Sequence, residues 1–519
     1  MRIGIDVGGT NTDAVLMDGA SVLAKTKTAT TADVTGGIVT AIEALLASSG
    51  VDRADLGAVM IGTTHFTNAV IERRRLAPTA ILRVGLPATL AVAPFEDWPA
   101  DLRQAIGGEA RLVHGGNEFD GRELAPLDPH EIAGVVDELV AAGVESLAVA
   151  AVFAPIAPQI EQRVGALVAE RAPGLTVTLS HEIGRLGLLE RENATAINAS
   201  LRPLAAATVA SFRASLRELA IDATLYLTQN DGTLMSADLA ERFPVLTFAS
   251  GPTNSMRGAA FLSGRQDALV LDVGGTTSDI GALVGGFPRE SAVGATFADV
   301  RTSFRMPDLI SFGLGGGTIL RGDEPRVGPD SVGYAITERA RVFGGDVLTA
   351  TDVAVAGGRA TVGDAERVAD LDPALVERAL TAMRAMTEDA LDRMKLARDP
   401  EPLIVVGGGS ILVPEQLAGA SEVLRPEHFE VANAVGAAIA QVSGEVDRIA
   451  PLAEGREQIL AAARGEAIER ATANGARADS VRIVEIEDVP VPYMEESMTR
   501  VRVKAVGELA AAFVTGGTA

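Results

Sequence analysis

The sequence contains no cysteine, which excludes thiol nucleophiles, disulfides and thiolate metal sites. Aromatic side chains make up only 4% of the 519 residues, so Ala, Val, Leu and Ile must fill most of any core. Hydrophobic residues still reach 47% of the chain, which is ample for more than one core. A chain of this length is expected to form two or three domains.

Positive charge is scarce, because 45 Lys and Arg residues face 69 Asp and Glu residues and leave a net charge of −24. A surface of that sign repels phosphate backbones and anionic lipid, so we expect no binding to nucleic acid or to a membrane. Any bound nucleotide must be held by backbone N–H groups, a metal and local cations.

Long hydrophobic runs are also missing. The most apolar stretch, residues 145–158, is too short and too interrupted by proline to span a bilayer. The N-terminus lacks the basic and apolar regions of a signal peptide. We therefore expect a cytoplasmic protein.

Helical and strand-like segments alternate in the first half of the chain. Helices are predicted over residues 131–143 and 158–174, and buried strands over 146–153 and 175–183. This alternation predicts an α/β fold with a parallel or mixed sheet. Further predicted elements are a helix from about 190 to 220 with a break at Pro203, a helix over 372–396, and a hairpin of strands 480–491 and 498–509 joined through 492–497.

An internal repeat is the most informative feature. Residues 6–13 read DVGGTNTD, residues 272–279 read DVGGTTSD, and six of the eight positions are identical. Each copy follows an apolar strand and precedes a second apolar segment with a Gly-containing turn, which predicts a β-hairpin in both places. The chain is therefore expected to hold two similar sheet domains, each presenting a glycine-rich turn.

The chemistry of these turns suits phosphate. Glycines let the backbone approach an anion, and successive N–H groups form a nest for its oxygens. Asp6 and Asp272 end their strands and are expected to hold Mg²⁺, directly or through water. Two ordinary tight turns are the alternative, but packing alone does not require the polar residues to repeat. The other nucleotide-binding candidates are Gly8, Gly9, Thr10, Asn11 and Asp13 in the first copy, and Gly274, Gly275, Thr276, Thr277 and Asp279 in the second.

Two further glycine clusters follow predicted strands. Three consecutive glycines leave room for a flat base or a ribose to lie against the backbone. Either cluster alone is a weak signal, and their order after the two hairpins gives them weight. The clusters are Gly315, Gly316 and Gly317 within residues 308–320, and Gly407, Gly408 and Gly409 within residues 401–414.

This order of motifs resembles the actin, hexokinase and heat-shock-chaperone ATPase superfamily. Within it, the chain resembles the hydantoinase/5-oxoprolinase family, specifically the N-methylhydantoinase A-like or acetone-carboxylase-β-like subunit. The resemblance covers roughly the first 445 residues. The segments that carry it are 3–16, 62–74, 179–204, 247–262, 271–281, 308–320, 349–358 and 432–441.

The resemblance implies two ribonuclease-H-like (actin-like ATPase) domains that close over ATP and Mg²⁺. We expect them at residues 1–187 and 188–445, followed by a short β-containing extension at 446–519. Members of the family are longer than this chain, so part of their C-terminal region is expected to be reduced or replaced here.

The resemblance also implies a reaction. ATP would phosphorylate the carbonyl oxygen of a cyclic amide (a hydantoin, 5-oxoproline or a lactam), which makes the carbon electrophilic and drives ring opening. The expected partner is a hydantoinase B-like subunit or a second copy of the chain. Three alternatives stay open: a carboxylase subunit of the acetone-carboxylase type, a small-molecule kinase, and a non-catalytic nucleotide-gated regulatory protein.

Five further residues are catalytic candidates. Thr63, Thr64 and Asn68 follow an apolar strand and are expected near the transferred phosphoryl group, although either threonine could simply cap the next helix. Glu190 and Arg191 begin a helix in the Glu-Arg segment of the family, and a helix-surface ion pair is the plain alternative.

The five histidines predict no zinc site, because none pairs with another at ligand spacing. Family members usually carry a histidine just before the Gly-Thr-Thr segment, where this chain has Ile61. His65 and His181 fall inside family segments, and they are the two histidines that merit a test.

Overall fold

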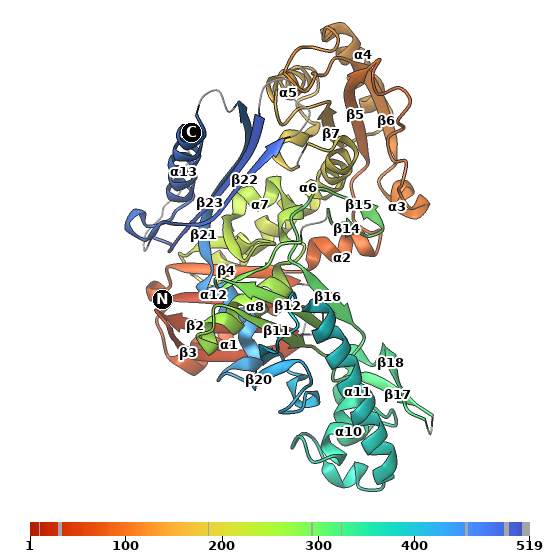
Figure 1. Cartoon of the computed structure of the whole chain (residues 1–519), viewed down its shortest axis with the longest axis vertical. Coiled ribbons are helices and arrows are strands. Elements are labelled where there is room, and N and C mark those ends of the chain that lie inside the picture. Colours follow the sequence, from red (N-terminus) through yellow and green to blue (C-terminus); the bar gives the residue numbers. More distant parts are fainter. Residues whose placement is uncertain are drawn as a thin grey trace.

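We describe a computed structural model of the chain. It covers residues 1–9, 11–29, 34–184, 186–291, 294–322, 324–451, 455–491 and 498–510. Three sheets of four or more strands carry the fold, and two of them contain the repeated octapeptides (Figure 1). In the part of the chain described here, no helix is long and apolar enough to cross a membrane.

The first repeat lies in a nine-stranded sheet with the order β22-β23-β21-β10-β9-β4-β1-β2-β3. β1 pairs antiparallel with β2, which places Asp6 opposite Asp13, so the first predicted hairpin is confirmed. The strands are β1 (Arg2–Val7), β2 (Asn11–Asp18), β3 (Ser21–Ala29), β4 (Ala58–Thr63), β9 (Thr224–Thr228), β10 (Thr233–Ser236), β21 (Gln441–Pro451), β22 (Arg482–Val491) and β23 (Met498–Gly507).

The second repeat lies in a six-stranded sheet, in which β13, β12, β11, β19 and β20 follow one another and β16 also pairs with β12. β11 pairs antiparallel with β12 and places Asp272 opposite Asp279, which confirms the second hairpin. The strands are β11 (Ala268–Val273), β12 (Ser278–Val284), β13 (Phe287–Pro288), β16 (Leu309–Phe312), β19 (Glu401–Val406) and β20 (Ala420–Leu424).

A parallel four-stranded sheet with the order β6-β5-β7-β8 lies at the top of Figure 1. It contains the helix–strand alternation predicted for residues 131–183. Its elements are β5 (Thr79–Leu86), β6 (Glu109–His114), α4 (Pro129–Ala141), β7 (Ser146–Ala151), α5 (Gln159–Arg171) and β8 (Thr176–Leu179), and two small hairpins elsewhere pair β14 (Thr296–Phe297) with β15 (Val300–Arg301) and β17 (Thr318–Arg321) with β18 (Arg326–Ser331).

The expected break at Pro203 is wrong, because one continuous helix, α6 (Leu188–Glu218), runs through it. Residues 191–201 of α6 are all buried, and this packing outweighs the hydrogen bond that proline removes. The other helices are α1 (Val34–Ser49), α2 (His65–Ile71), α3 (Ala100–Ala105), α7 (Ala237–Arg242), α8 (Ser250–Ser263), α9 (Ile336–Arg339), α10 (Ala350–Ala356), α11 (Pro373–Met394), α12 (Ala432–Ile439) and α13 (Arg456–Ala473).

The C-terminal segment joins the first sheet. β22 and β23 pair antiparallel as predicted, and β23 also pairs with β21 along its whole length. Residues 492–497, expected to join them, lie outside the described residues. β9 and β10, which fall in the range expected for the second domain, also belong to the nine-stranded sheet. The residue numbers at which the three expected domains begin and end therefore stay a prediction.

Helices α8 and α12 cross between the two repeat-bearing sheets (Figure 1). A Cβ at Gly258 would overlap the carbonyl oxygen of Ala432, and a Cβ at Gly436 would overlap that of Asn254. The absence of side chains at these glycines lets the two backbones touch. The crossing fixes the first turn of each helix beside the repeated octapeptides.

Candidate active site

The two glycine-rich turns have the same backbone geometry. The N–H of Gly8 donates to the carbonyl oxygen of Asn11 at 3.0 Å, and the N–H of Gly274 donates to that of Thr277 at 2.9 Å. Gly9 is exposed, and no atom lies within 4 Å of the place where its Cβ would be. Both turns thus offer backbone to an anion. Thr10 lies outside the described residues, whereas Thr276 and Thr277 are exposed on the second turn.

Asp6 is a buried carboxylate held by two amides. Asn254 on α8 donates to its Oδ1 at 3.1 Å, and Asn433 on α12 donates to its Oδ2 at 3.0 Å. Burial raises the pKa of Asp6 from 3.8 to about 6, and Asp13 raises it further, while the amides and Lys27 act in the opposite direction.

Asp272 has a single hydroxyl donor. Ser255, next to Asn254 on α8, donates to Oδ2 of Asp272 at 2.5 Å. Burial raises the pKa of Asp272 to about 6, and both Asp279 and Asp6 raise it further. Two matched carboxylates therefore lie close enough to repel each other, so a cation between or beside them would stabilise both.

The second aspartate of each repeat is bound by protein groups. Asp13 forms an ion pair with Lys27 at 2.9 Å and accepts from Asn433 at 2.8 Å. Asp279 accepts from Ser311 on β16, and burial raises its pKa. These contacts tie each hairpin to its surroundings, so we assign both residues a bracing role, and contact with nucleotide stays a prediction for them and for Asn11.

A glycine stands beside each of the two strand-end aspartates. Gly62 lies opposite Asp6 in the parallel β1–β4 pair, and a Cβ there would meet Asp6 Oδ1 at 2.5 Å and also overlap Asn254. Gly407 follows β19 with φ +85°, and a Cβ there would overlap Asp272 Oδ1 and lie 2.5 Å from the carbonyl oxygen of Val273. The close packing of both carboxylates depends on these glycines.

The first of the two further glycine clusters braces the second turn. The N–H groups of Gly316 and Gly317 donate to the carbonyl oxygens of Gly274 and Gly275 at 3.0 and 2.7 Å. The N–H of Gly315 donates to Oγ1 of Thr318 at 2.7 Å. All three glycines are buried, so their backbone donors serve the protein, and their contact with nucleotide stays a prediction.

The last glycine cluster lies against β11. The N–H of Gly409 donates to the carbonyl oxygen of Val273 at 2.8 Å, and the N–H of Gly407 donates to the carbonyl oxygen of Phe429 at 3.0 Å. Gly408 is exposed with no atom within 4 Å of its Cβ position. Gly408 therefore offers a flat backbone surface beside the second turn.

Thr63, Thr64 and Asn68 lie beside the first hairpin. Val7 of β1 pairs with Thr63 in the parallel register, and Oγ1 of Thr64 donates to the carbonyl oxygen of Val7 at 3.4 Å. The N-cap position of α2 is Thr64, whose side chain makes no capping hydrogen bond, while Oγ1 of Thr63 accepts from the N–H of His65 at 3.2 Å. Asn68, one turn later, donates to Oγ1 of Thr64 at 3.5 Å.

The surface ion pair considered for Glu190 and Arg191 is wrong, because the Arg191 side chain is fully buried. Its Nε donates to Oγ of Ser180 at 2.8 Å, and its guanidinium also donates to the carbonyl oxygens of Leu186 at 2.8 Å and Ala151. Glu190 is half-buried, and its carbonyl oxygen accepts from the N–H of Ser303 at 3.2 Å. Arg191 thus braces the segment before α6.

His65 and His181 have different surroundings. Nε2 of His65 lies 3.2 Å from Nη1 of Arg75, and burial, followed by that cation, lowers the pKa of His65. His181 lies 2.7 Å from the buried carboxylate of Glu161. Both histidines therefore have defined polar partners.

Sequence reasoning missed four side chains: Lys27, Asn254, Ser255 and Asn433. All four contact an aspartate of the repeats. Three of them lie in segments 247–262 and 432–441, which the resemblance had marked without giving any residue a role. Their roles follow from the α8–α12 crossing, which no local sequence pattern reveals.

Mg²⁺ fits Asp6 and Asp272 only as a cation that takes most of its other ligands from water and phosphate. Among the described residues, no three His, Cys, Asp or Glu side chains gather into a metal site. Mg²⁺ typically takes one or two carboxylates and fills its shell with water and substrate phosphates. Asp6 and Asp272 suit that role, and a cation there would relieve their mutual repulsion.

Comparisons with known proteins agree with this geometry. Residues 2–172 match the hydantoinase/oxoprolinase N-terminal region, and residues 191–389 match hydantoinase/oxoprolinase. The chain is 28% identical over 364 residues to the caprolactamase subunit alpha of Pseudomonas jessenii, covering 64% of this chain and 51% of that protein. It is 26% identical over 388 residues to the acetophenone carboxylase gamma subunit of Aromatoleum aromaticum, covering 68% and 52%. The chain spans about half the length of these curated relatives.

Two solved structures share the fold. The ATP-dependent caprolactamase from Pseudomonas jessenii aligns over 100% of this chain and 90% of its own, with a TM-score of 0.77 and 20% identity. Nucleotide-free acetone carboxylase aligns over 100% and 89%, with a TM-score of 0.70 and 17% identity. The expected actin-like ATPase fold is confirmed. The chain belongs to the hydantoinase/oxoprolinase family.

Proposed function

We propose that this chain is the ATP-using subunit of an amidohydrolase that phosphorylates the carbonyl oxygen of a cyclic amide to drive ring opening. The observation that carries the proposal is the matched pair of carboxylates, the buried Asp6 and the half-buried Asp272, each at the end of a strand that leads into a glycine-rich turn. The similarity to a caprolactamase subunit points to a cyclic amide as the class of substrate.

In this proposal the two turns hold the phosphates of ATP and the two aspartates hold Mg²⁺. Gly8, Gly9 and Thr10 act on one side, and Gly274, Gly275, Thr276 and Thr277 act on the other. Bound Mg²⁺ neutralises charge on the phosphoryl oxygens. The chain itself supplies orientation, since Asn254, Asn433 and Ser255 fix the carboxylate oxygens.

Thr63, Thr64 and Asn68 belong to the same proposal. Thr63 is the last residue of β4 and pairs with Val7, the last residue of β1, Thr64 follows it, and Asn68 lies on α2, so all three are near the first turn. Their hydroxyl and amide groups would donate hydrogen bonds to the phosphoryl group that is transferred. Phosphoryl transfer requires little more than such positioning and charge neutralisation.

A second subunit is also proposed. The two curated relatives are named as subunits, alpha in caprolactamase and gamma in acetophenone carboxylase. A hydantoinase B-like partner would complete ring opening, and a homo-oligomer is the other arrangement. Co-purification of a second chain would distinguish the two.

A carboxylase is the alternative function, and the acetophenone carboxylase relative favours it at nearly the same identity as the caprolactamase. ATP would then activate bicarbonate or a ketone. A requirement for bicarbonate in turnover would select this alternative.

The test is phosphate release from Mg·ATP with and without hydantoins, 5-oxoproline and lactams. Asp6→Asn and Asp272→Asn should abolish the substrate-stimulated part. Asp18→Asn is the matched control, because Asp18 is an exposed residue at the far end of β2. Equal stimulation in the wild type and both repeat variants would contradict the proposal.

A further inference from the structure

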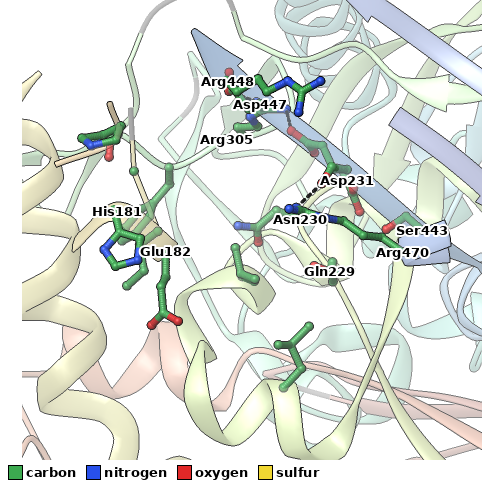
Figure 2. Close-up of a pocket in the computed structure, with 18 of the residues that line it drawn as sticks. His181, Glu182, Gln229, Asn230, Asp231, Arg305, Ser443, Asp447, Arg448 and Arg470 are labelled. Atoms are coloured by element: carbon green, nitrogen blue, oxygen red, sulfur yellow. Dashed lines mark hydrogen bonds and ion pairs between the residues drawn. The ribbon is translucent and has the colours of Figure 1, made fainter. Parts of the chain in front are cut away.

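The lining of a cavity of about 540 Å³ includes no described residue of the two glycine-rich turns. Its walls come from the segment between β8 and α6, the β9–β10 turn, residues 303–305, and β21. Figure 2 shows His181 and Glu182 on one side of this space and Asp231, Asp447 and Arg448 on the other. Such a hollow, lined by several converging polar groups, has the features of a small-molecule site.

His181 is held in this wall by a buried carboxylate. Its Nδ1 lies 2.7 Å from Oε2 of Glu161, and the same oxygen accepts from the N–H of His181 at 2.9 Å. The Glu161 side chain is fully buried and lines no part of the cavity, whereas His181 does. Nδ1 therefore points into the protein, and Nε2, at the opposite edge of the ring, faces the cavity.

A second layer fixes Glu161. Its Oε1 accepts from the N–H of Ala151 at 2.7 Å and from the hydroxyl of Ser180 at 2.5 Å. Arg191 in turn donates to Ser180 Oγ at 2.8 Å. The buried chain Arg191–Ser180–Glu161–His181 thus orients one imidazole from a family segment, and it gives Arg191 a positioning role.

Ser303 provides a second, independent indication of a ligand. Its Oγ is buried and has no hydrogen-bond partner among the described residues, although Ser303 also lines the cavity. Its neighbour Gly184 lies so close that a Cβ there would overlap this oxygen. A buried hydroxyl without a partner is costly, and a ligand group in the cavity would satisfy it.

The charged groups of the wall all form ion pairs, and Arg448 and Arg470 share one carboxylate. Every Arg, Asp and Glu that lines the cavity within the described residues has an oppositely charged partner. The pairs are Arg305 with Glu445 and Asp447, Arg500 with Asp447, Arg448 and Arg470 with Glu466, Glu182 with Arg242, and Asp231 with Lys504. The cavity therefore offers hydrogen bonds to a ligand without offering it an unpaired charge.

The cavity wall is linked to Asp6 through two elements. Asn230, which lines the cavity, accepts through its carbonyl oxygen from Oγ1 of Thr253 at 3.0 Å. Asn254, which follows Thr253 on α8, donates to both Asp6 and Thr228. Thr228 and Asn230 are two residues apart, a span of at most about 7 Å. The cavity and the candidate phosphate site thus share the N-terminal half of α8 and the end of β9.

We propose that this cavity binds the ring of an uncharged cyclic amide. Nε2 of His181 accepts a hydrogen bond from the ring N–H, and Oγ of Ser303 donates one to a ring carbonyl. This inference rests on the proposed function for the substrate class and adds the location, the two contacts and the charge preference. Rings without a carboxylate, such as hydantoin and 2-pyrrolidone, bind at least ten times more tightly than 5-oxoproline, whose carboxylate finds no unpaired cation among the described residues.

Direct binding tests the proposal without turnover. Calorimetry would measure the Kd of hydantoin, 2-pyrrolidone and 5-oxoproline for the full chain in the presence of Mg²⁺ and a non-hydrolysable ATP analogue. His181→Asn keeps an amide N–H for Glu161 in place of Nδ1 but removes Nε2, and Ser303→Ala removes only the hydroxyl. His114→Asn is the matched control, because His114 also pairs with a carboxylate, Glu131 at 3.0 Å, but is exposed and lies outside the cavity.

We expect each cavity variant to raise the Kd of hydantoin about tenfold or more, with the Kd of the nucleotide analogue and the His114→Asn values unchanged. Unchanged hydantoin binding in both cavity variants, no binding of any ring, or preference for 5-oxoproline would overturn the proposal. Ring binding that both variants lose, without any ring-stimulated ATP turnover, would support the cavity and reject the proposed reaction.

Discussion

The two hairpins carry nearly the same octapeptide, but the protein supports them in different ways. Asp6 accepts from two amides, one on α8 and one on α12, whereas Asp272 accepts from the single hydroxyl of Ser255. The first turn is open around Gly9, whereas the second is braced from behind by residues 315–317. Burial nevertheless raises the pKa of each aspartate from 3.8 to about 6.

This comparison separates the features that both hairpins share from the supporting contacts that differ between the two sheets. A carboxylate beside a glycine-rich turn is present in both copies, as expected if each turn holds part of one ligand. The supporting groups differ because α12 reaches the first sheet, while residues 315–317 reach the second. Variants that act on one hairpin at a time can therefore separate the shared role from the local support.

The largest effect is expected from the aspartates themselves. Asp6→Asn and Asp272→Asn should each lower substrate-stimulated ATP turnover by roughly 10²–10³-fold, because each removes one preorganised charge from the proposed metal site. Turnover against Mg²⁺ concentration would check this. A variant with near wild-type turnover would mean that its hairpin has no part in the reaction.

The same two substitutions should raise the stability of the ligand-free chain, and Asp272→Asn should raise it more than Asp6→Asn. The pKa of each carboxyl is about 6 in the folded chain against 3.8, so the stability that its protonated form contributes is present below pH 3.8 and lost as the pH rises through about 6. At pH 8 without ligand, Asp272→Asn should therefore raise the melting midpoint. At pH 5 the gain should shrink.

At pH 8, Asp6→Asn should raise the melting midpoint by less than Asp272→Asn. Both oxygens of Asp6 accept from amides, and an asparagine offers only one acceptor, so one donor would face an NH₂ group. The hydroxyl of Ser255 can still donate to the remaining oxygen at position 272. Equal midpoints for the two variants would show that the amides do not distinguish the hairpins.

Glycine substitutions should give intermediate effects. Gly407→Ala combines φ +85° with a backbone contact at 2.5 Å, whereas Gly62→Ala displaces side chains only. We expect Mg·ATP affinity to fall about tenfold or more for Gly407→Ala and by less for Gly62→Ala. Gly134→Ala on α4 is the control, since no atom lies within 4 Å of its Cβ position. Isothermal titration would rank the three, and an equal loss in Gly134→Ala would contradict the steric account.

The smallest expected effect is a shift in the acid limb of the pH–rate profile, the pH range in which turnover falls as the solution becomes more acidic. Both aspartates must be ionised to hold a cation, so turnover should fall as the pH drops through about 6. Asn433→Ala removes a hydrogen bond that lowers the pKa of Asp6, and Ser255→Ala does the same for Asp272. Each should move the limb upward by up to about one pH unit. A pH–rate profile that stays in place would show that these donors do not tune the carboxylates.

The sequence alone predicted the hairpins, the α/β fold and the strand-end aspartates, because apolar strands, glycine turns and a repeated motif are local features. It failed at Pro203, where the burial of α6 outweighs a local penalty. It also missed Asn254, Ser255 and Asn433, whose roles depend on a helix crossing made possible by Gly258 and Gly436. The surface ion pair that it offered as the alternative role for Arg191 is wrong, because this side chain is buried and donates to Ser180.

The central claim is that both hairpins act on one ATP to activate a cyclic amide. Phosphate release from Mg·ATP by the purified chain, with its partner subunit where one co-purifies, tests it most directly when hydantoins and lactams are added to the wild type and to the two aspartate variants. We expect a cyclic amide to stimulate the release, and both variants to lose this stimulation. Stimulation that survives in Asp6→Asn or Asp272→Asn, or no binding of ATP at all, would contradict it.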